Sequence, residues 1–149
     1  MTRKPLRYFL NDEAKGNGVK IRPPRELDAG FDLPAVRETV VAAKSFMLIE
    51  TGVHLAIPEG WVGVIRDRSS IALRGGIISA GVIDASYRGE VKVAFHNLGD
   101  NPIRFAAGER IAQCLILPHL SGTQSLEMES LDALGETDRG TGGFGSTGK

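Results

Sequence analysis

Residues 46–65, FMLIETGVHLAIPEGWVGVI, decide the fold class of this chain. The stretch holds three apolar runs, at residues 46–49, 53–57 and 61–65, and the turn sequence Pro-Glu-Gly separates the last two. Runs of this length that are rich in β-branched or aromatic residues and bounded by Gly or Pro are typical of β-strands. We therefore predict a strand at each run.

Further apolar runs of strand length follow at residues 91–95 and 111–117. Strands that recur at this spacing predict a β-sandwich or barrel. Helix is expected to be scarce, with at most one short helix. Residues 69–73 suit one or two turns with a serine cap and a glycine stop, and residues 125–134 suit a short acidic turn or helix. The expectation is an all-β domain over residues 1–138.

The two ends of the chain differ from its middle. Residues 1–27 are basic and contain Arg-Pro-Pro-Arg at 22–25, which suits an extended stretch along a surface or a sheet edge. Residues 139–149 carry five of the 19 glycines and predict a flexible arm. Gly143–Lys149 partly matches a phosphate loop, but that loop must open a helix, so we reject the match. Phe144 leaves two interpretations open, an unstructured tail or an arm that orders by stacking on a nucleobase.

Composition excludes several classes of protein. The 149 residues suffice for one domain but not for separate cofactor and substrate domains. Because 18 Lys and Arg balance 18 Asp and Glu, no bulk field attracts a polyanion and no nucleic-acid partner is expected. The single cysteine, Cys114, allows no internal disulfide and is interpreted as a small buried hydrophobe. The scattered His54, His96 and His119 predict no metal site. Without a recognisable signal peptide or membrane-spanning run, we expect a cytoplasmic protein with no membrane partner.

Two acidic residues are candidates for chemistry. Asp84 ends an apolar run before a turn-like segment, where a carboxylate is held rigidly yet stays reachable. The alternative is an ordinary hairpin with a surface Asp84 and a salt-bridging Arg88. Asp32 lies inside the apolar stretch 29–33 and needs either hydrogen-bond donors or a metal with its waters, so a structural role is an equal alternative.

A third candidate is the basic and hydroxyl-rich segment Asp67-Arg68-Ser69-Ser70. Hydroxyls, free amides and a guanidinium at the start of a short helix can together bind an anion. The alternative is a plain serine cap beside a surface arginine.

Taken in chain order, these segments resemble the five motifs of the trimeric dUTPase family, the deoxyuridine triphosphate pyrophosphatases. A single segment of this kind carries little weight, but five in the family's order span the chain from residue 29 to residue 148. The matching segments are Ala29–Leu33, Arg68–Ser70, Gly81–Asp84 with Tyr87–Gly89, Gly108–Gln113 and Arg139–Gly148.

The resemblance implies a jelly-roll β-sandwich, a homotrimer with active sites at the subunit contacts, and hydrolysis of dUTP to dUMP and pyrophosphate. That reaction limits uracil incorporation into DNA and supplies dUMP for thymidylate synthesis. Asp84 would activate the attacking water, and Asp32 would face Mg²⁺ through water ligands. The residues expected to hold the phosphates are Arg68, Ser69, Ser70, Gln113, Arg139, Ser146 and Thr147.

The same resemblance implies how the nucleoside is recognised. Backbone donors and acceptors of an expected hairpin at residues 79–83 would pair with the edge of uracil. Cytosine presents the opposite pattern, so these backbone groups would be left unpaired against it. Tyr87 would leave no space for a 2′-hydroxyl, and Phe144 from the arm, residues 139–149, would cover the base. The hairpin residues expected at the base are Ser79, Gly81, Val82 and Ile83.

Three positions depart from the family pattern. Asp67 replaces the usual proline before Arg68 and puts a carboxylate beside a phosphate-binding guanidinium. Ser86 and Pro34 replace an acidic or small residue and a basic residue, respectively. None of the three removes a residue assigned to chemistry.

Two other functions compete with this interpretation. A dCTP deaminase of the same fold needs a catalytic Glu in the strand at 91–97, where Ala94 lies near the expected position and no acidic residue occurs. A non-hydrolysing nucleotide sensor or structural jelly-roll subunit gives no reason for Asp84, Tyr87 and Phe144 to accompany the phosphate residues. A regulatory role beside hydrolysis stays open.

Overall fold

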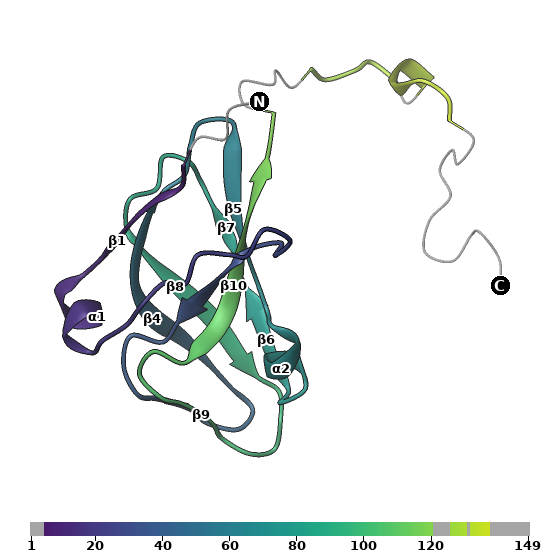
Figure 1. The fold of residues 1–149 in the computed structure, drawn as a ribbon. Coiled ribbons are helices and arrows are strands. Elements are labelled where there is room, and N and C mark those ends of the chain that lie inside the picture. Colours follow the sequence, from purple (N-terminus) through teal and green to yellow (C-terminus); the bar gives the residue numbers. More distant parts are fainter. Residues whose placement is uncertain (1–4, 121–125, 131, 138–149) are drawn as a thin grey trace.

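The computed structural model describes residues 5–120, 126–130 and 132–137. Within these residues the strands form two four-stranded sheets and one two-stranded sheet, and every pair is antiparallel (Figure 1). The first sheet has the order β1 (Arg7–Leu10), β4 (Ser45–Ala56), β8 (Glu90–Asn97) and β6 (Gly76–Ser79). The second has the order β2 (Phe31–Pro34), β10 (Arg110–Pro118), β5 (Trp61–Arg66) and β7 (Val82–Ile83). The small sheet pairs β3 (Thr39–Val41) with β9 (Ile103–Phe105).

One hydrophobic core joins the sheets. Phe95 of β8 and Phe105 of β9 are fully buried and meet edge to face, with ring centroids 5.3 Å apart. Leu33 of β2 and Cys114 of β10 enter the same cluster from the second sheet. Burial of apolar faces from both large sheets holds the layers together. The prediction of an all-β sandwich is confirmed.

Two of the expected strands are a single strand. Residues 46–49 and 53–57 fall in or beside β4, whose pairing with β8 shifts register between Glu50 and His54. Gly52 lies in this irregularity with a φ of 69°, a conformation that glycine adopts without strain. A Cβ at Gly52 would lie only 2.5 Å from the Cβ of Ala14. The glycine therefore allows the helix that carries Ala14 to pack against β4.

That helix corrects the prediction of at most one short helix. The described ranges contain two short α-helices, α1 (Asp12–Gly16) and α2 (Ser69–Ala72), and the 3₁₀ turn η1 (Asp132–Leu134). Asn11 caps α1 by accepting a hydrogen bond from the Ala14 amide at 2.9 Å. The cap Asn11 and the acidic residues after it are local signals of a helix, but a helix of five residues also depends on its packing against β4. The expected edge position is confirmed for β1, whose one partner strand among the described residues is β4.

The second helix begins one residue earlier than the sequence suggested. Arg68 rather than a serine is the N-cap of α2, and its side chain makes no capping hydrogen bond. The expected glycine stop is present at Gly75, which has a φ of 82° two residues after the C-cap. In the described part of the chain, no helix is long and apolar enough to cross a membrane.

The segment that links β6 and β7 crosses from one large sheet to the other, so residues 79–83 do not form the expected hairpin. Each of the two strands is the last in its sheet, so each has one edge without a partner strand among the described residues. The Ile65 amide donates to the Gly81 carbonyl at 2.7 Å, and a Cβ at Gly81 would collide with the Ile65 carbonyl oxygen. Glycine is thus required where this linking segment passes β5.

Candidate active site

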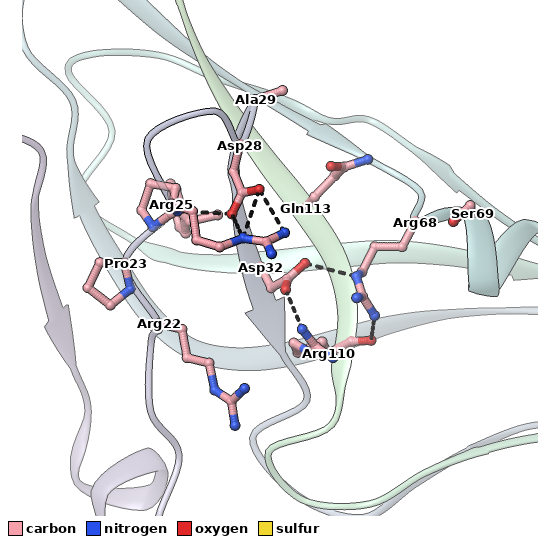
Figure 2. Close-up of a pocket in the computed structure, with 13 residues that line it drawn as sticks. Arg22, Pro23, Arg25, Asp28, Ala29, Asp32, Arg68, Ser69, Arg110 and Gln113 are labelled. Carbon is pink, nitrogen blue, oxygen red and sulfur yellow. Dashed lines mark hydrogen bonds and ion pairs between the residues drawn. The ribbon is translucent and has the colours of Figure 1, made fainter.

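Four of the candidate residues line one pocket, which we call the arginine pocket. It has a volume of about 540 Å³ and lies where residues 22–32, the start of α2 and strand β10 meet (Figure 2). Ser69 and Gln113 line it together with Asp32 and Arg68. Its charged lining residues are Arg22, Arg25, Asp28, Asp32, Arg68 and Arg110.

Asp32 bridges two arginines in this pocket. Its Oδ1 lies 2.8 Å from Nε of Arg68, and its Oδ2 accepts a hydrogen bond from Nη1 of Arg110 at 3.1 Å. Arg68 also donates to the Arg110 carbonyl at 3.2 Å. The strand register places Asp32 opposite Gln113, and Gly30 lets the chain approach β10 because a Cβ there would strike the Cys114 carbonyl. The pocket therefore holds two guanidinium groups that share one carboxylate.

Gln113 is fixed by the segment that carries Arg68. Its Nε2 donates to the Asp67 carbonyl at 3.0 Å, which ties β10 to the end of β5. Ser69 and Ser70 are exposed in the first turn of α2. The arrangement offers guanidinium, amide and hydroxyl donors to an anion, the chemistry that phosphate oxygens require.

A second pocket, the Tyr87 pocket, has a volume of about 260 Å³. Asp84 directly follows β7, and the Tyr87 amide donates to the Asp84 carbonyl at 3.1 Å, which closes a turn. The Tyr87 hydroxyl donates to the Glu90 carbonyl at 2.9 Å and so fixes the ring. The residues that line the pocket are Ala80, Val82, Ile83, Asp84, Tyr87, Glu90 and Lys92.

The Asp84 side chain is exposed and makes no ion pair or hydrogen bond with the residues that the structure describes. Arg88 instead donates to the carbonyls of Ala85 and Tyr87 at 2.6 and 2.7 Å. The alternative of an ordinary hairpin with a salt-bridging Arg88 is wrong, since β7 and β8 lie in different sheets and Arg88 forms no ion pair with the residues that the structure describes. Asp84 is a carboxylate in contact with solvent at the rim of a pocket.

Of the hairpin residues expected at the base, Val82 and Ile83 line the Tyr87 pocket, whereas Ser79 and Gly81 do not. Ser79 Oγ lies 2.8 Å from Nε2 of His96, a contact that sequence reasoning missed because the two strands are remote in the chain. Ala80 has a φ of 49°, which is unusual for a residue with a Cβ.

The two pockets have no lining residue in common in the described part of the chain. Within one chain, Arg68 and Asp84 therefore line different pockets. The expected arm residues Arg139, Phe144, Ser146 and Thr147 lie outside the described residues. The pocket is also lined by Arg22, Arg25 and Asp28, which were assigned no role from the sequence because they precede the recognised motif at residue 29.

Metal ligands are sparse. The described residues contain no group of three or more His, Cys, Asp or Glu side chains that could hold a metal ion. Among the described residues that line the arginine pocket, the carboxylates are Asp28 and Asp32, and Asp28 is bound to Arg25. A Mg²⁺ ion, which keeps several waters and usually takes one or two carboxylates plus substrate phosphates, fits this donor set.

The remaining cysteine takes no part in either pocket. Cys114 is completely buried, which confirms its interpretation as a small hydrophobe, and burial raises the pKa of its thiol to about 12. A thiol of this kind is protonated at neutral pH and is a poor nucleophile.

These features define a β-sandwich protein with an arginine-lined pocket whose donors suit an anionic ligand. The chain matches the family model described as dUTPase over residues 17–148. It is 45% identical over 125 residues to a deoxyuridine 5′-triphosphate nucleotidohydrolase of Corynebacterium jeikeium, covering 81% of this chain and 80% of the relative. It is 46% identical over 124 residues to the protein of that name from Wolinella succinogenes, with coverage of 81% and 80%.

A solved structure agrees with these relatives. The Staphylococcus bacteriophage 80alpha dUTPase, a G164S mutant with dUpNHpp, superimposes with a TM-score of 0.85 and 26% identity, covering 99% of this chain and 100% of that one. The chain belongs to the dUTPase family. This confirms the predicted family, the enzyme class and the jelly-roll form of the β-sandwich.

Proposed function

We propose that this protein hydrolyses dUTP to dUMP and pyrophosphate, with Asp84 activating the water that attacks the α-phosphorus in line. One observation carries the assignment of Asp84: its carboxylate follows the edge strand β7, is exposed, and has no ionic partner in the described part of the chain. A base in this position can accept a proton from water, and in-line phosphoryl transfer needs that alignment more than covalent chemistry. The reaction would limit uracil in DNA and supply dUMP for thymidylate synthesis.

The edge of β7 that is free in the described part of the chain supports recognition of uracil by backbone groups. Strand β7 pairs with β5 on one side, and its other edge has no partner strand among the described residues. Unpaired amides and carbonyls at an edge can bind the donor and acceptor pattern of a base. Cytosine presents the opposite polarity and would leave buried groups unpaired. Tyr87, held by Glu90, would exclude a 2′-hydroxyl.

The arginine pocket supports binding of the triphosphate by Arg68, Ser69, Ser70 and Gln113. Asp32 would face Mg²⁺ through water, and the ion, when bound, neutralises phosphate charge. Both oxygens of Asp32 are paired with arginines in the free protein, so substrate binding would exchange these pairs for contacts to phosphate and metal-bound water. The arm of residues 139–149, with Arg139, Phe144, Ser146 and Thr147, would close over the ligand.

We also propose a homotrimer with shared active sites. It is supported by the separation of the two pockets, because a second copy can bring its Tyr87 pocket to the arginine pocket of the first. The dUpNHpp complex of the phage relative agrees with a nucleotide ligand. The cytoplasmic location, the lack of a nucleic-acid partner and the boundary at residue 138 stay predictions.

The experiment measures pyrophosphate release from dUTP, dTTP, dCTP and UTP with Mg²⁺. We expect turnover of dUTP alone and a loss in kcat of roughly 10²- to 10⁴-fold in Asp84→Asn. Asp12→Asn, which removes an exposed carboxylate on α1, is the matched control and should keep full activity. A chain ending at residue 138 should lose most activity yet stay folded. Ammonia release from dCTP, or equal turnover of UTP, would overturn the assignment.

A further inference from the structure

Arg22 lies at the junction of two pockets. It lines the arginine pocket and also a neighbouring pocket of about 400 Å³ that contains Lys20. Asp32 and Arg110 line both as well, so the two pockets are continuous at these residues. Lys20 and Arg22 therefore extend the positive charge around Arg68 along the segment that precedes the recognised motifs, and Glu109 also lines the neighbouring pocket.

The charges in the arginine pocket do not cancel. Four arginines face two aspartates, which leaves two positive charges in excess. Arg25 is bound to Asp28 by contacts of 3.0 to 3.3 Å, and this contact lowers the pKa of the Asp28 carboxyl. Asp32 is shared between two other arginines.

Arg22 has no such partner. It makes no hydrogen bond or ion pair with any residue that the structure describes, and no dashed line reaches its guanidinium in Figure 2. It is exposed and can still meet an oxyanion without first breaking an existing pair. A planar guanidinium binds phosphate oxygens through two parallel hydrogen bonds.

The backbone around Arg22 is restrained. Ile21 packs against the hydrophobic core, and Pro23 and Pro24 follow directly. Proline fixes its own φ and confines the preceding residue to extended conformations. The backbone of Arg22 is thus already ordered beside the pocket, so that ligand binding costs little further backbone entropy there.

We propose that Arg22 binds the phosphate end of the substrate, and pyrophosphate after hydrolysis, beside Arg68. The inference deepens the proposed function and rests on it for the identity of the substrate. It makes Arg22 a binding residue that discriminates triphosphate from monophosphate. It gives Arg22 no part in the attack on the α-phosphorus.

The test compares Arg22→Gln with Arg25→Gln in the full chain. Both substitutions lower the pocket charge by one, so an effect of the overall field alone would be equal in the two variants. Calorimetry with pyrophosphate should show affinity weakened roughly ten-fold or more in Arg22→Gln, about the loss of one charge-assisted hydrogen bond. Arg25→Gln should weaken binding clearly less, and Arg22→Lys should restore part of it.

Kinetics supply the second measurement. With dUTP, Arg22→Gln should raise KM by a similar factor and change kcat less than about two-fold, while dUMP affinity stays unchanged. Equal shifts in the two Gln variants, or unchanged pyrophosphate affinity in Arg22→Gln, overturn the inference. If the wild type binds pyrophosphate through Arg22 but does not hydrolyse dUTP, the proposed function fails and the anion site stands.

Discussion

The Asp32 carboxylate lies 2.8 Å from Nε of Arg68 and binds Arg110 through its other oxygen at 3.1 Å. The side chains of Asp32 and Arg68 are 28% and 24% exposed, so water screens this pair only in part. In the free protein, Asp32 therefore competes with any phosphate for the Arg68 guanidinium. The same carboxylate is the proposed partner of magnesium-bound water, so its removal has opposite consequences for two measurable properties.

In Asp32→Asn we expect tighter binding of pyrophosphate without Mg²⁺ but slower hydrolysis of dUTP with Mg²⁺. The first effect follows because both arginines lose their competitor, and a charge removed at this distance changes affinity on the order of three- to ten-fold in a partly screened site. The second follows because the proposed Mg²⁺ site would lose the carboxylate assigned to its water ligands. Calorimetry in EDTA and a Mg²⁺ titration of activity measure the two effects. Weaker pyrophosphate binding in the metal-free variant would contradict this account of the pocket.

Sequence alone predicted the β-sandwich and located β4, β5, β8 and β10, because apolar runs bounded by turn residues are local signals. It assigned no strand to β2, β3 or β9, which are only three or four residues long. It missed α1, whose stability depends on packing Ala14 into the gap left by Gly52, and a gap of that kind is a tertiary property. It also predicted one helix where the described chain has two α-helices.

The candidate site shows the same division between local and tertiary information. The motif residues Asp32, Arg68 and Gln113 do lie together, but no motif showed that Asp32 binds two arginines. Arg22 was noted only as part of a basic, proline-rich segment, because it precedes the motifs and reaches the pocket only through folding.

A surface network of charges predicts how stability depends on pH. Arg37 binds Glu13 at 2.6 Å and Glu50 at 2.6 Å, and Lys92 binds Glu50 at 3.0 Å. Hydrogen bonds from Lys92 and Arg37 hold the pKa of Glu50 below its ordinary value of 4.5, and Arg37 does the same for Glu13. Because these pKa values are lower in the folded state, the stabilisation is present above about pH 4.5 and is lost as pH falls through the folded-state values.

We therefore expect Glu50→Gln to lower the urea midpoint at pH 6 to 8 by a constant amount, and this difference from wild type to shrink below pH 4.5. The control is Glu26→Gln, an exposed carboxylate that forms no ion pair among the described residues. Urea denaturation at several pH values measures both. A difference that grows on acidification would show that the network does not stabilise the fold.

Asn97 of β8 is a buried polar residue that satisfies several backbone groups. Its amide nitrogen donates to the carbonyls of Val41, Ala42 and Asn101 at 2.9 to 3.1 Å, and its oxygen accepts from the Gly99 amide at 3.0 Å. In Asn97→Ala these groups lose their partner, and we expect a loss of about 2 to 4 kcal/mol in the free energy of unfolding. Asn101→Ala, at an exposed position, should change it by less than about 0.5 kcal/mol. Equal effects of the two substitutions would contradict the assigned role.

Cys114 makes the packing of β10 measurable. This strand lies between β2 and β5, and the adjacent residue Gln113 lines the arginine pocket. Since the thiol is buried and its pKa is raised to about 12, we expect no reaction with a disulfide reagent at pH 8 until β10 separates from its neighbours. The labelling rate should rise steeply with urea and show full reactivity only in the unfolded protein.

Saturating pyrophosphate should slow labelling further if the ligand holds Gln113 and Arg110 in place, because binding to the closed state lowers the open population. Rapid labelling of the native protein would show instead that the centre of the second sheet opens without unfolding.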